Sequence, residues 1–396
     1  MIIKRPIFEK LLNELDKPFV SILIGPRQVG KSFLLRLIFD HVQKLGLNPK
    51  YYDLENPNDL NLFIGDEATL IDRLSQEGQV IFIDEFQYLK NATKIFKVLV
   101  DRRPSGPKIF ASGSSSIEIH KHLKESLAGR YRVSTIFPLS LNEIMQNSKY
   151  NILDYFKFCG MPGLLNEVDS DDKMSLLNNI LQTYLLKDIK ALVREENIRS
   201  FNHLLYLLAQ NQGSIVSIAN LAREVGLSEP AITKHLEIMH QTFVAFPLAS
   251  YSNNLGNELK KIKKYYLYDL GIRNSLLKDF SSIENRQDKG AILESYVFLA
   301  LNKYLKLNME LKFWRTRQGA EVDFVLLKDR IPIPIEVKYG QKDNSIPSGI
   351  KQFIQRYPLS ESGLIVTMDY TDKASFDGKT INIIKWTELE SFFERC

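Results

Sequence analysis

The chain has 396 residues, which is long enough for two or three domains with separate hydrophobic cores. Hydrophobic residues make up 44% of it and charged residues 25%, a composition that excludes a fibrous or wholly disordered protein. The net charge of +5 permits nucleic-acid binding but does not argue for it, so local basic clusters must carry that case.

Cysteine usage and the N-terminus indicate where the protein works. Cys159 and Cys396 are too few and too far apart for a disulfide framework or a metal knuckle, which is typical of a reducing compartment. Residues 1–6 lack the apolar core of a signal peptide, and no apolar run approaches the ~20 residues that span a bilayer. We therefore expect a cytoplasmic protein without membrane contact.

The clearest pattern is G-P-R-Q-V-G-K-S at residues 25–32, which fits the phosphate-binding loop G-x-x-x-x-G-K-[S/T]. Residues 19–24 read as a buried strand before it, and residues 33–39 read as a helix after it. The glycines let backbone N–H groups face a phosphate, and the helix N-terminus adds partial positive charge. Lys31 is expected to reach the β- and γ-phosphates, and Ser32 to bind Mg²⁺.

The residues expected to contact the nucleotide are those of the loop and the first turn of its helix. They are Gly25, Pro26, Arg27, Gln28, Val29, Gly30, Lys31, Ser32 and Phe33.

The second motif is a pair of acidic residues that follows an apolar run at residues 80–83. Such an apolar run is typical of a strand buried on both faces of a parallel sheet. The run ends in Asp84 and Glu85. Ligands of open α/β sheets bind at the carboxyl ends of strands, so we expect Asp84 to hold Mg²⁺ and Glu85 to act as general base on the attacking water. Alternatively, these are two solvated acids that end a strand.

Two further residues are weaker candidates. A strand at residues 108–111 leads into serines, of which Ser114 could sense the γ-phosphate, although serines are also common turn residues. Arg130, before a strand at residues 133–137, could supply charge to the transferring phosphate in cis or from a neighbouring subunit. A lone arginine is equally compatible with a surface position.

Together these motifs resemble those of the AAA-type P-loop ATP-binding proteins of bacteria and archaea, in which the P-loop domain precedes a C-terminal domain of unknown function. The resemblance covers nearly the whole chain. It implies ATP or ADP as ligand and the roles given above for Lys31, Ser32, Asp84 and Glu85. AAA relatives often form rings, and in such a homo-oligomer Arg130 would act between subunits. Its motifs include residues 25–32, 83–87, 112–114, 127–130, 154–162, 184–189 and 266–271.

The middle of the chain is expected to be helical, with a connector over residues 151–210. Residues 217–225, a turn with Gly226, and a helix from residue 229 resemble a winged helix-turn-helix. The second helix would lie in a DNA groove. Its expected outward residues are only weakly basic, so packing against the ATPase is the alternative. They are Glu229, Thr233, Lys234 and His235.

A basic stretch at residues 260–264 precedes Tyr265 and Tyr266. Its four lysines could grip phosphates while the tyrosines stack on bases. The alternative is a solvated wing leading into a tyrosine-rich strand.

From about residue 285 the predicted elements run helix, three strands, helix, strand. This order, with Asp323 followed by Glu336-x-Lys338, resembles the restriction-endonuclease-like PD-(D/E)xK fold. The match is closest to the Holliday-junction-resolvase branch, which implies a further acid on the first helix, here Glu294.

The residue types of this group support metal chemistry. Residues two apart in a strand share a face, so Glu336 and Lys338 project together, and Asp323 on a neighbouring strand can meet them. Two carboxylates suit Mg²⁺, and a lysine beside them can orient water or neutralise developing charge. The alternatives are a surface salt-bridge cluster and an inactive nuclease fold that only binds DNA.

We therefore predict an α/β protein of three domains: an AAA-type P-loop ATPase with a parallel sheet (1–145), a helical connector with a winged helix (146–284) and a nuclease-like α/β domain (285–396). The predicted function is Mg²⁺-dependent ATP hydrolysis that acts on DNA, including branched DNA, in processing, recombination, repair or defence. The alternatives are an ATP-controlled switch whose inactive nuclease fold binds DNA or protein, and a motor that remodels protein partners.

Overall fold

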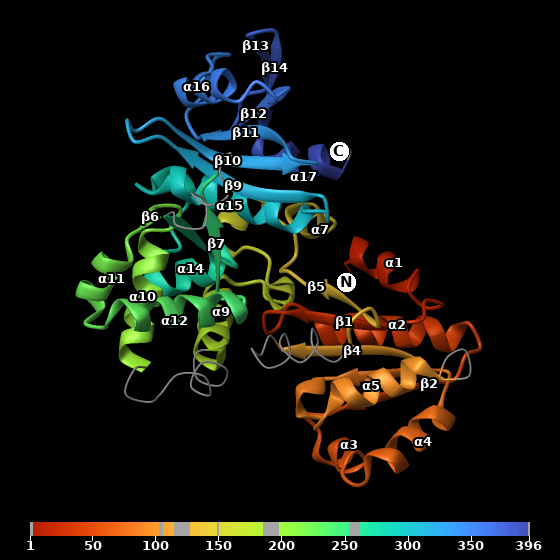
Figure 1. Cartoon of the computed structure of the whole chain (residues 1–396). Coiled ribbons are helices and arrows are strands. Elements are labelled where there is room, and N and C mark those ends of the chain that lie inside the picture. Colours follow the sequence, from red (N-terminus) through yellow and green to blue (C-terminus); the bar gives the residue numbers. More distant parts are fainter. Residues whose placement is uncertain are drawn as a thin grey trace. The chain divides into compact units, whose positions relative to one another are not determined.

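The computed structural model describes residues 3–102, 106–114, 127–148, 150–184, 198–252 and 262–394. It divides into two compact units, Met1–Pro138 with Gln241–Val244, and Leu139–His240 with Ala245–Cys396 (Figure 1). The division into three domains remains a prediction, and each unit is described by itself.

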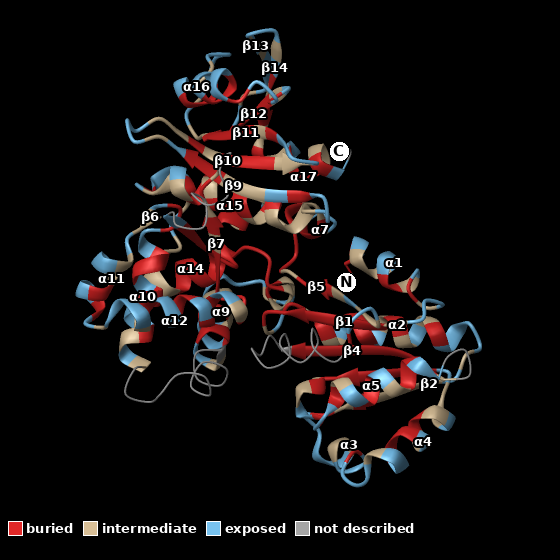
Figure 2. Ribbon diagram, viewed as in Figure 1, coloured by how far each residue is buried: buried red, intermediate tan, exposed pale blue. Residues whose placement is uncertain are grey.

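The first unit is built on a five-stranded sheet in the order β2-β3-β4-β1-β5. Every neighbouring pair in it is parallel, which confirms the predicted parallel α/β sheet. All residues of β1 and β3 are buried, because helices cover both faces (Figure 2). The strands are β1 (Val20–Gly25), β2 (Pro49–Asp53), β3 (Val80–Asp84), β4 (Lys108–Ser114) and β5 (Tyr131–Thr135).

The helices of this unit use local sequence signals at their ends. Helix α2 begins directly after the glycine loop and buries an apolar face that includes Leu34, Ile38 and Val42. Asp66 caps α4 by accepting from the Thr69 N–H at 3.0 Å. The helices are α1 (Pro6–Leu12), α2 (Lys31–Lys44), α3 (Pro57–Asn61), α4 (Glu67–Glu77), α5 (Ala92–Asp101) and the 3₁₀ turn η1 (Phe86–Tyr88).

The first half of the second unit contains helices around a small antiparallel sheet in the order β6-β8-β7. The strands are β6 (Ile215–Val216), β7 (Ala245–Ala249) and β8 (Lys263–Leu267). The helices are α7 (Leu141–Ile144), α8 (Tyr155–Phe158), α9 (Ser170–Tyr184), α10 (Ile198–Gln210), α11 (Ile218–Val225), α12 (Glu229–Gln241) and α14 (Leu270–Leu277), with 3₁₀ turns η2 (Ile152–Asp154), η3 (Pro162–Asn166) and η6 (Ile283–Asn285).

The second half carries a six-stranded mixed sheet in the order β13-β14-β12-β11-β10-β9. The expected strands are present, but the sequence analysis missed β13 and β14, which pair antiparallel and extend the sheet beyond β12. The elements are α15 (Lys289–Tyr304), β9 (Met309–Arg315), β10 (Glu321–Lys328), β11 (Ile331–Lys338), α16 (Ser348–Arg356), β12 (Ser362–Thr367), β13 (Asp372–Phe376), β14 (Lys379–Lys385), η7 (Trp386–Glu388) and α17 (Leu389–Glu394).

Two glycines and one aspartate join α8 to α14. The buried Asp269 carboxylate caps α14 by accepting from the Ile272 N–H at 3.0 Å and also accepts from the Gly160 N–H at 3.2 Å. A Cβ on Gly271 would lie 2.3 Å from the Phe158 carbonyl oxygen, so only glycine fits this approach of two backbones. Gly160, Asp269 and Gly271, which belong to the motifs of the resemblance, therefore serve packing here.

We predict that Gly271→Ala destabilises the second unit by at least about 1–3 kcal/mol, because the added methyl group overlaps the Phe158 carbonyl. Gly290→Ala is the matched control: its Cβ would meet no atom within 4 Å, and the effect should be neutral or stabilising. Urea unfolding followed by tryptophan fluorescence measures this unit, since Trp314 and Trp386 are the chain's two tryptophans. If the two variants unfolded at the same urea concentration, the packing argument would be contradicted.

Candidate nucleotide and metal sites

The glycine loop joins the carboxyl end of β1 to the first turn of α2. Gly25 has φ +150°, and a Cβ there would lie 2.2 Å from the Ile136 carbonyl oxygen. Gly30 is left-handed with φ +90° and provides no side-chain cap for α2, so the first-turn N–H groups face the loop. The buried Lys31 ammonium donates to the carbonyl oxygens of Gly25 (3.0 Å) and Pro26 (2.7 Å). The loop is thus a backbone cradle with a lysine inside it.

Arg5 supports this loop, a role that the sequence analysis missed. Its buried guanidinium donates to the Val29 carbonyl oxygen at 2.8 Å and to the Phe137 carbonyl oxygen at 2.7 Å. Arg5 belongs to no recognisable sequence motif, so only the folded structure identifies this contact.

Asp84 ends β3 and is held on both carboxylate oxygens. The Tyr51 hydroxyl donates to Oδ2 at 2.8 Å from β2, and the Ser112 hydroxyl donates to Oδ1 from β4. Only 2% of Asp84 is exposed, so these donors replace water and fix the direction of the carboxylate. The register explains the arrangement, because Ile83 pairs with Ala111 and brings Ser112 level with Asp84.

Glu85 adopts a left-handed conformation (φ +54°), which is unusual for a residue with a side chain. Gln87 Nε2 donates to its Oε2 at 2.5 Å. Burial raises the pKa of the Glu85 carboxyl, and the Gln87 hydrogen bond and the Lys31 charge partly offset that rise. A partly desolvated carboxylate near the lysine of the loop is suited to accept a proton.

Ser114 and Arg130 differ in where they lie on the sheet. Ser114 ends β4 in register with Gly25, beside the loop. Arg130 lies at the amino edge, where its carbonyl accepts from the Val20 N–H at 2.9 Å and its Nε is 2.6 Å from Asp101 Oδ1. The length of β1, roughly 17–20 Å for a six-residue strand, separates Arg130 from the loop, so this structure does not bring Arg130 to the expected phosphate site. The role between subunits remains a prediction.

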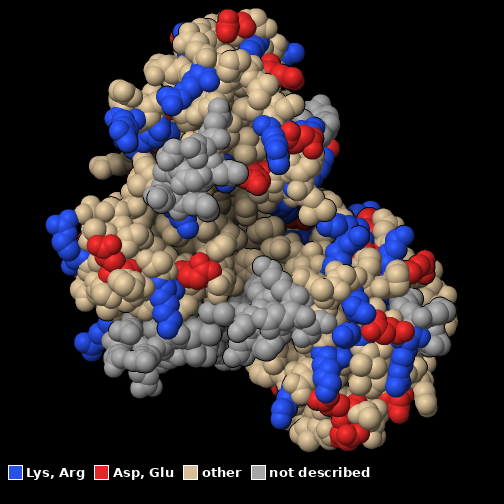
Figure 3. Space-filling view, in the orientation of Figure 1, with Lys and Arg blue, Asp and Glu red and all other residues tan. Residues whose placement is uncertain are grey.

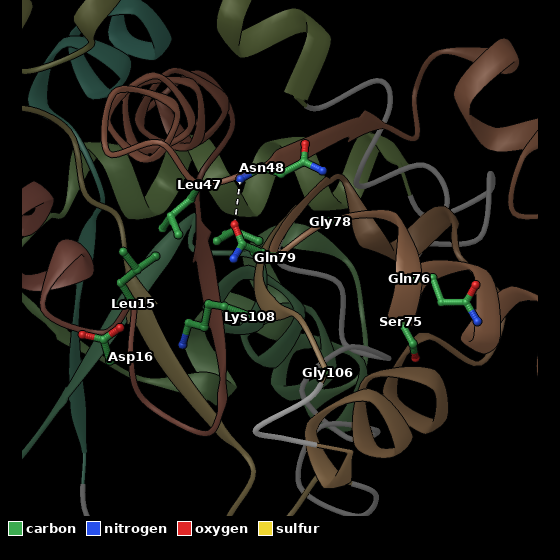
Figure 4. Close-up of a pocket in the computed structure, with 11 residues that line it drawn as sticks. Leu15, Asp16, Leu47, Asn48, Ser75, Gln76, Gly78, Gln79, Gly106 and Lys108 are labelled. Carbon is green, nitrogen blue, oxygen red and sulfur yellow. Dashed lines mark hydrogen bonds between the residues drawn. The ribbon is translucent and has the colours of Figure 1, made fainter.

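A pocket of about 450 Å³ lies at the amino ends of β3 and β4, away from the glycine loop (Figure 4). Asn48 and Gln79 line it and are joined by a 3.1 Å hydrogen bond from the Asn48 N–H to Gln79 Oε1. Lys108 also lines it, with its ammonium 2.7 Å from the Phe19 carbonyl oxygen. This pocket is distinct from the expected nucleotide site.

In the second unit, the carboxylates predicted on β10 and β11 lie side by side. Asp323 Oδ2 accepts from the Val337 N–H at 2.8 Å, and the Asp323 N–H faces Glu336 Oε2 at 3.4 Å. Lys338 Nζ is 2.8 Å from Glu336 Oε1. Burial raises the pKa of Asp323 and of Glu336, and the Lys338 charge opposes the rise at both.

Glu294 on α15 belongs to the same group but is held by residues that the sequence analysis assigned to another role. Its Oε1 accepts from the Tyr266 hydroxyl at 2.6 Å and from Lys264 Nζ at 3.2 Å. Burial raises the pKa of Glu294, the Asp323 charge adds to that rise, and Lys264 opposes it. Gly213 packs closely against the Glu294 carboxylate, since a Cβ on this glycine would lie 3.0 Å from Glu294 Oε1.

These positions contradict two expectations for the middle region. Lys264, Tyr265 and Tyr266 are buried, so they cannot grip phosphates or stack on bases, while Lys260 and Lys261 lie outside the described residues. His235 was expected on the outward face of α12 but is buried, with its ring 5.4 Å from Phe201. The helical spacing of Ile232, His235 and Met239 already indicated the buried face.

The donor atoms present are compatible with Mg²⁺. In the first unit they are the Asp84 carboxylate and the hydroxyl of Ser32, and in the second the carboxylates of Asp323 and Glu336. Mg²⁺ favours oxygen ligands and is commonly bound by one or two carboxylates together with water and phosphate oxygens. Among the residues that the structure describes, no three His, Cys, Asp or Glu side chains form a metal-binding group, so an all-protein cage is absent there.

Three family models match consecutive parts of the chain. Residues 17–145 match an AAA domain, residues 150–283 a domain of unknown function (DUF8612) and residues 289–389 another domain of unknown function (DUF4143). The first match covers the parallel sheet, the glycine loop and the Asp84-Glu85 pair. Residues 17–145 are thus similar to an AAA domain, and this match supports an AAA-type ATPase.

Relatives of similar length carry no assigned activity. An uncharacterized protein of Haemophilus influenzae is 24% identical over 415 residues, covering 98% of both chains. One of Mycobacterium tuberculosis is 26% identical over 340 residues, covering 85% of this chain and 74% of its own length. One of Methanocaldococcus jannaschii is 27% identical over 354 residues, covering 83% and 77%.

Solved structures resemble the chain only loosely. A signal-transduction ATPase with a tetratricopeptide-repeat sensor from Pyrococcus horikoshii aligns with a TM-score of 0.31 at 13% identity, covering 78% of this chain and 46% of that one. The replication initiator DnaA bound to AMPPCP and single-stranded DNA aligns with a TM-score of 0.28 at 13% identity, covering 59% and 86%. No helix among the described residues is long and apolar enough to cross a membrane.

We predict that Tyr51→Phe lowers ATP turnover by the AAA-type domain roughly tenfold, because a hydrogen bond to the buried Asp84 carboxylate is lost. The KM for ATP should change less, since the glycine loop keeps its contacts. Tyr52→Phe is the matched control, as Tyr52 packs edge-on against Phe63 at 5.0 Å on the other face of β2. Steady-state ATPase assays measure both variants, and equal turnover would exclude the positioning role of Tyr51.

Proposed function

We propose that this protein is an Mg²⁺-dependent ATP hydrolase that acts on DNA through a group of acidic residues in its second unit. This acid group contains Glu294, Asp323 and Glu336. The observation that carries the ATPase part is the arrangement at one sheet edge: Lys31 in the loop, a doubly held Asp84 and a strained, half-buried Glu85. This arrangement supports the proposal, because phosphoryl transfer to water uses a loop lysine, a metal-binding carboxylate and a group that orients the attacking water.

The steps follow from the protein groups. In the proposed complex Lys31 exchanges the Gly25 and Pro26 carbonyls for phosphate oxygens, and the first-turn N–H groups of α2 contact the same phosphates. Ser32 and Asp84 would hold Mg²⁺, which when bound neutralises charge on the phosphate oxygens. Glu85 accepts the proton of the attacking water, and Gln87 keeps its carboxylate aimed.

The C-terminal part of the proposal rests on the neighbouring Asp323, Glu336 and Lys338. Helix α15, the antiparallel strands β9–β11, helix α16 and the parallel strand β12 follow the element order of the PD-(D/E)xK fold. In the proposed site Asp323 and Glu336 would hold a divalent ion beside a phosphodiester, and Lys338 would orient water or stabilise the developing charge.

The middle region supports DNA contact less strongly. Its order of helix, strand, two helices and two strands fits a winged helix. However, the exposed charges of α12 are Glu229, Lys234 and Glu237, which do not form the basic stripe of a DNA reader. On the face shown in Figure 3, lysines and arginines lie among aspartates and glutamates on each unit. These charges favour a protein contact over a DNA contact at α12. The alternative for the whole protein is an ATP-controlled switch whose nuclease-like fold binds DNA or a protein without cutting it.

For the ATPase, Glu85→Gln should retain ATP binding and lower turnover by roughly 10²–10⁴, the usual contribution of a general base. Nucleotide binding measured by fluorescent ATP analogue and turnover measured by phosphate release separate the two effects. Glu67→Gln, an exposed acid paired with Lys94, serves as control and should behave as wild type. Normal turnover of Glu85→Gln would remove Glu85 from the mechanism.

For the acid group, purified protein in Mg²⁺ should cut linear or branched DNA, and Asp323→Asn and Lys338→Met should each lower cleavage at least about 10²-fold. Asp343→Asn and Lys342→Met are exposed controls of the same types in the following loop. Intact DNA binding with no cleavage of any substrate would favour the switch.

ATPase rates with and without these DNAs complete the comparison. Stimulation by DNA supports the proposed coupling, whereas stimulation by a protein partner alone favours a motor that remodels proteins.

A further inference from the structure

Lys264 lies at the centre of the acid group, although it belongs to β8 of the small middle sheet. Its side chain is 3% exposed, and Nζ is 2.8 Å from Glu321 Oε1 and 3.2 Å from Glu294 Oε1. The ammonium also lies 5.4 Å from the centroid of the Phe313 ring. A buried ammonium between two carboxylates occupies the kind of position that a cation takes in an acidic site.

The surroundings hold this ammonium in one place. Lys264 is in register with Leu248 on one side and Ile215 on the other, so its backbone is fixed in the interior strand of the sheet. Its neighbour on the same face, Tyr266, is fully buried, stacks on Phe298 at 4.1 Å and donates to Glu294. The lysine is therefore part of a packed wall and not a mobile surface chain.

Charge balance shows what the group can accommodate. When all are ionised, the carboxylates of Glu294, Glu321, Asp323 and Glu336 face the ammonium groups of Lys264 and Lys338, which leaves two negative charges. Arg315 reaches Glu321 at 3.4 Å from an exposed position, where solvent screens its charge. One divalent cation neutralises the remainder, whereas a second would add unbalanced charge in a buried place.

We propose that Lys264 is the built-in cation of this acid group: it engages Glu294 and Glu321, so that Asp323 and Glu336 take one divalent ion and no second ion binds. This inference rests on the proposed metal site. Lys264 and Glu294 are then positioning residues. The site is also composite, because Lys264 and Tyr266 precede the C-terminal family match at residues 289–389.

The test counts Mn²⁺ ions bound per chain without nucleotide, by isothermal titration and by electron paramagnetic resonance of free Mn²⁺. Wild type should bind one ion, and Asp323→Asn should lose it. Lys264→Met should bind two ions, the first about tenfold tighter, since a positive charge near the carboxylates is gone. Lys264→Arg keeps the charge and should bind one ion.

Lys263→Met is the matched control, because Lys263 is the exposed neighbour on the same strand and should leave binding unchanged. Lys264→Gln retains a donor for Glu294 and repeats the test if the methionine variant does not fold. Counting only the ions that Asp323→Asn removes, one ion of unchanged affinity in Lys264→Met or Lys264→Gln, or two ions in wild type, overturns the role of Lys264 alone. Absence of binding by wild type, or unchanged binding by Asp323→Asn, overturns the proposed metal site itself.

Discussion

Buried carboxylates that need fixed donors are the constraint on which both candidate sites depend. Asp84 is held by hydroxyls from two neighbouring strands. Glu294 of helix α15 is held by a lysine and a tyrosine of strand β8. An unpaired buried carboxylate is costly, so each acid dictates what its neighbours must be. The same donors that make burial tolerable also aim the carboxylates, and this aim is what a metal or a proton acceptor requires.

In the AAA-type domain, parallel strand order turns distant residues into one site. The strands β3, β4 and β1 lie side by side, so their carboxyl ends bring Asp84, Ser112 and the glycine loop to one edge. The opposite edge holds Arg130 and the pocket around Lys108. The glycine loop and Asp84 are thus separated from Arg130 by the length of a strand.

In the second unit, the acid group links the middle region to the C-terminal sheet. A lysine predicted to face DNA instead enters the carboxylate cluster, which removes a basic contact from the surface and adds a cation to the site. The contact between Lys264 and the carboxylates matters for both candidate functions, the nuclease and the non-cleaving switch. In the proposed nuclease it would limit the metal content, and in a non-cleaving domain it would keep the acids neutralised.

The sequence by itself determined the parallel AAA-type sheet, the loop with Lys31 and the acids Asp84 and Glu85, because these depend on local spacing and strand periodicity. It also identified Asp323, Glu336 and Lys338 as residues of neighbouring strands. Only the tertiary structure decided that Tyr51 and Ser112 hold Asp84, that Arg130 lies at the far edge and that Lys264 meets Glu294. Those contacts depend on strand register and on packing between segments far apart in the chain, which no local pattern encodes.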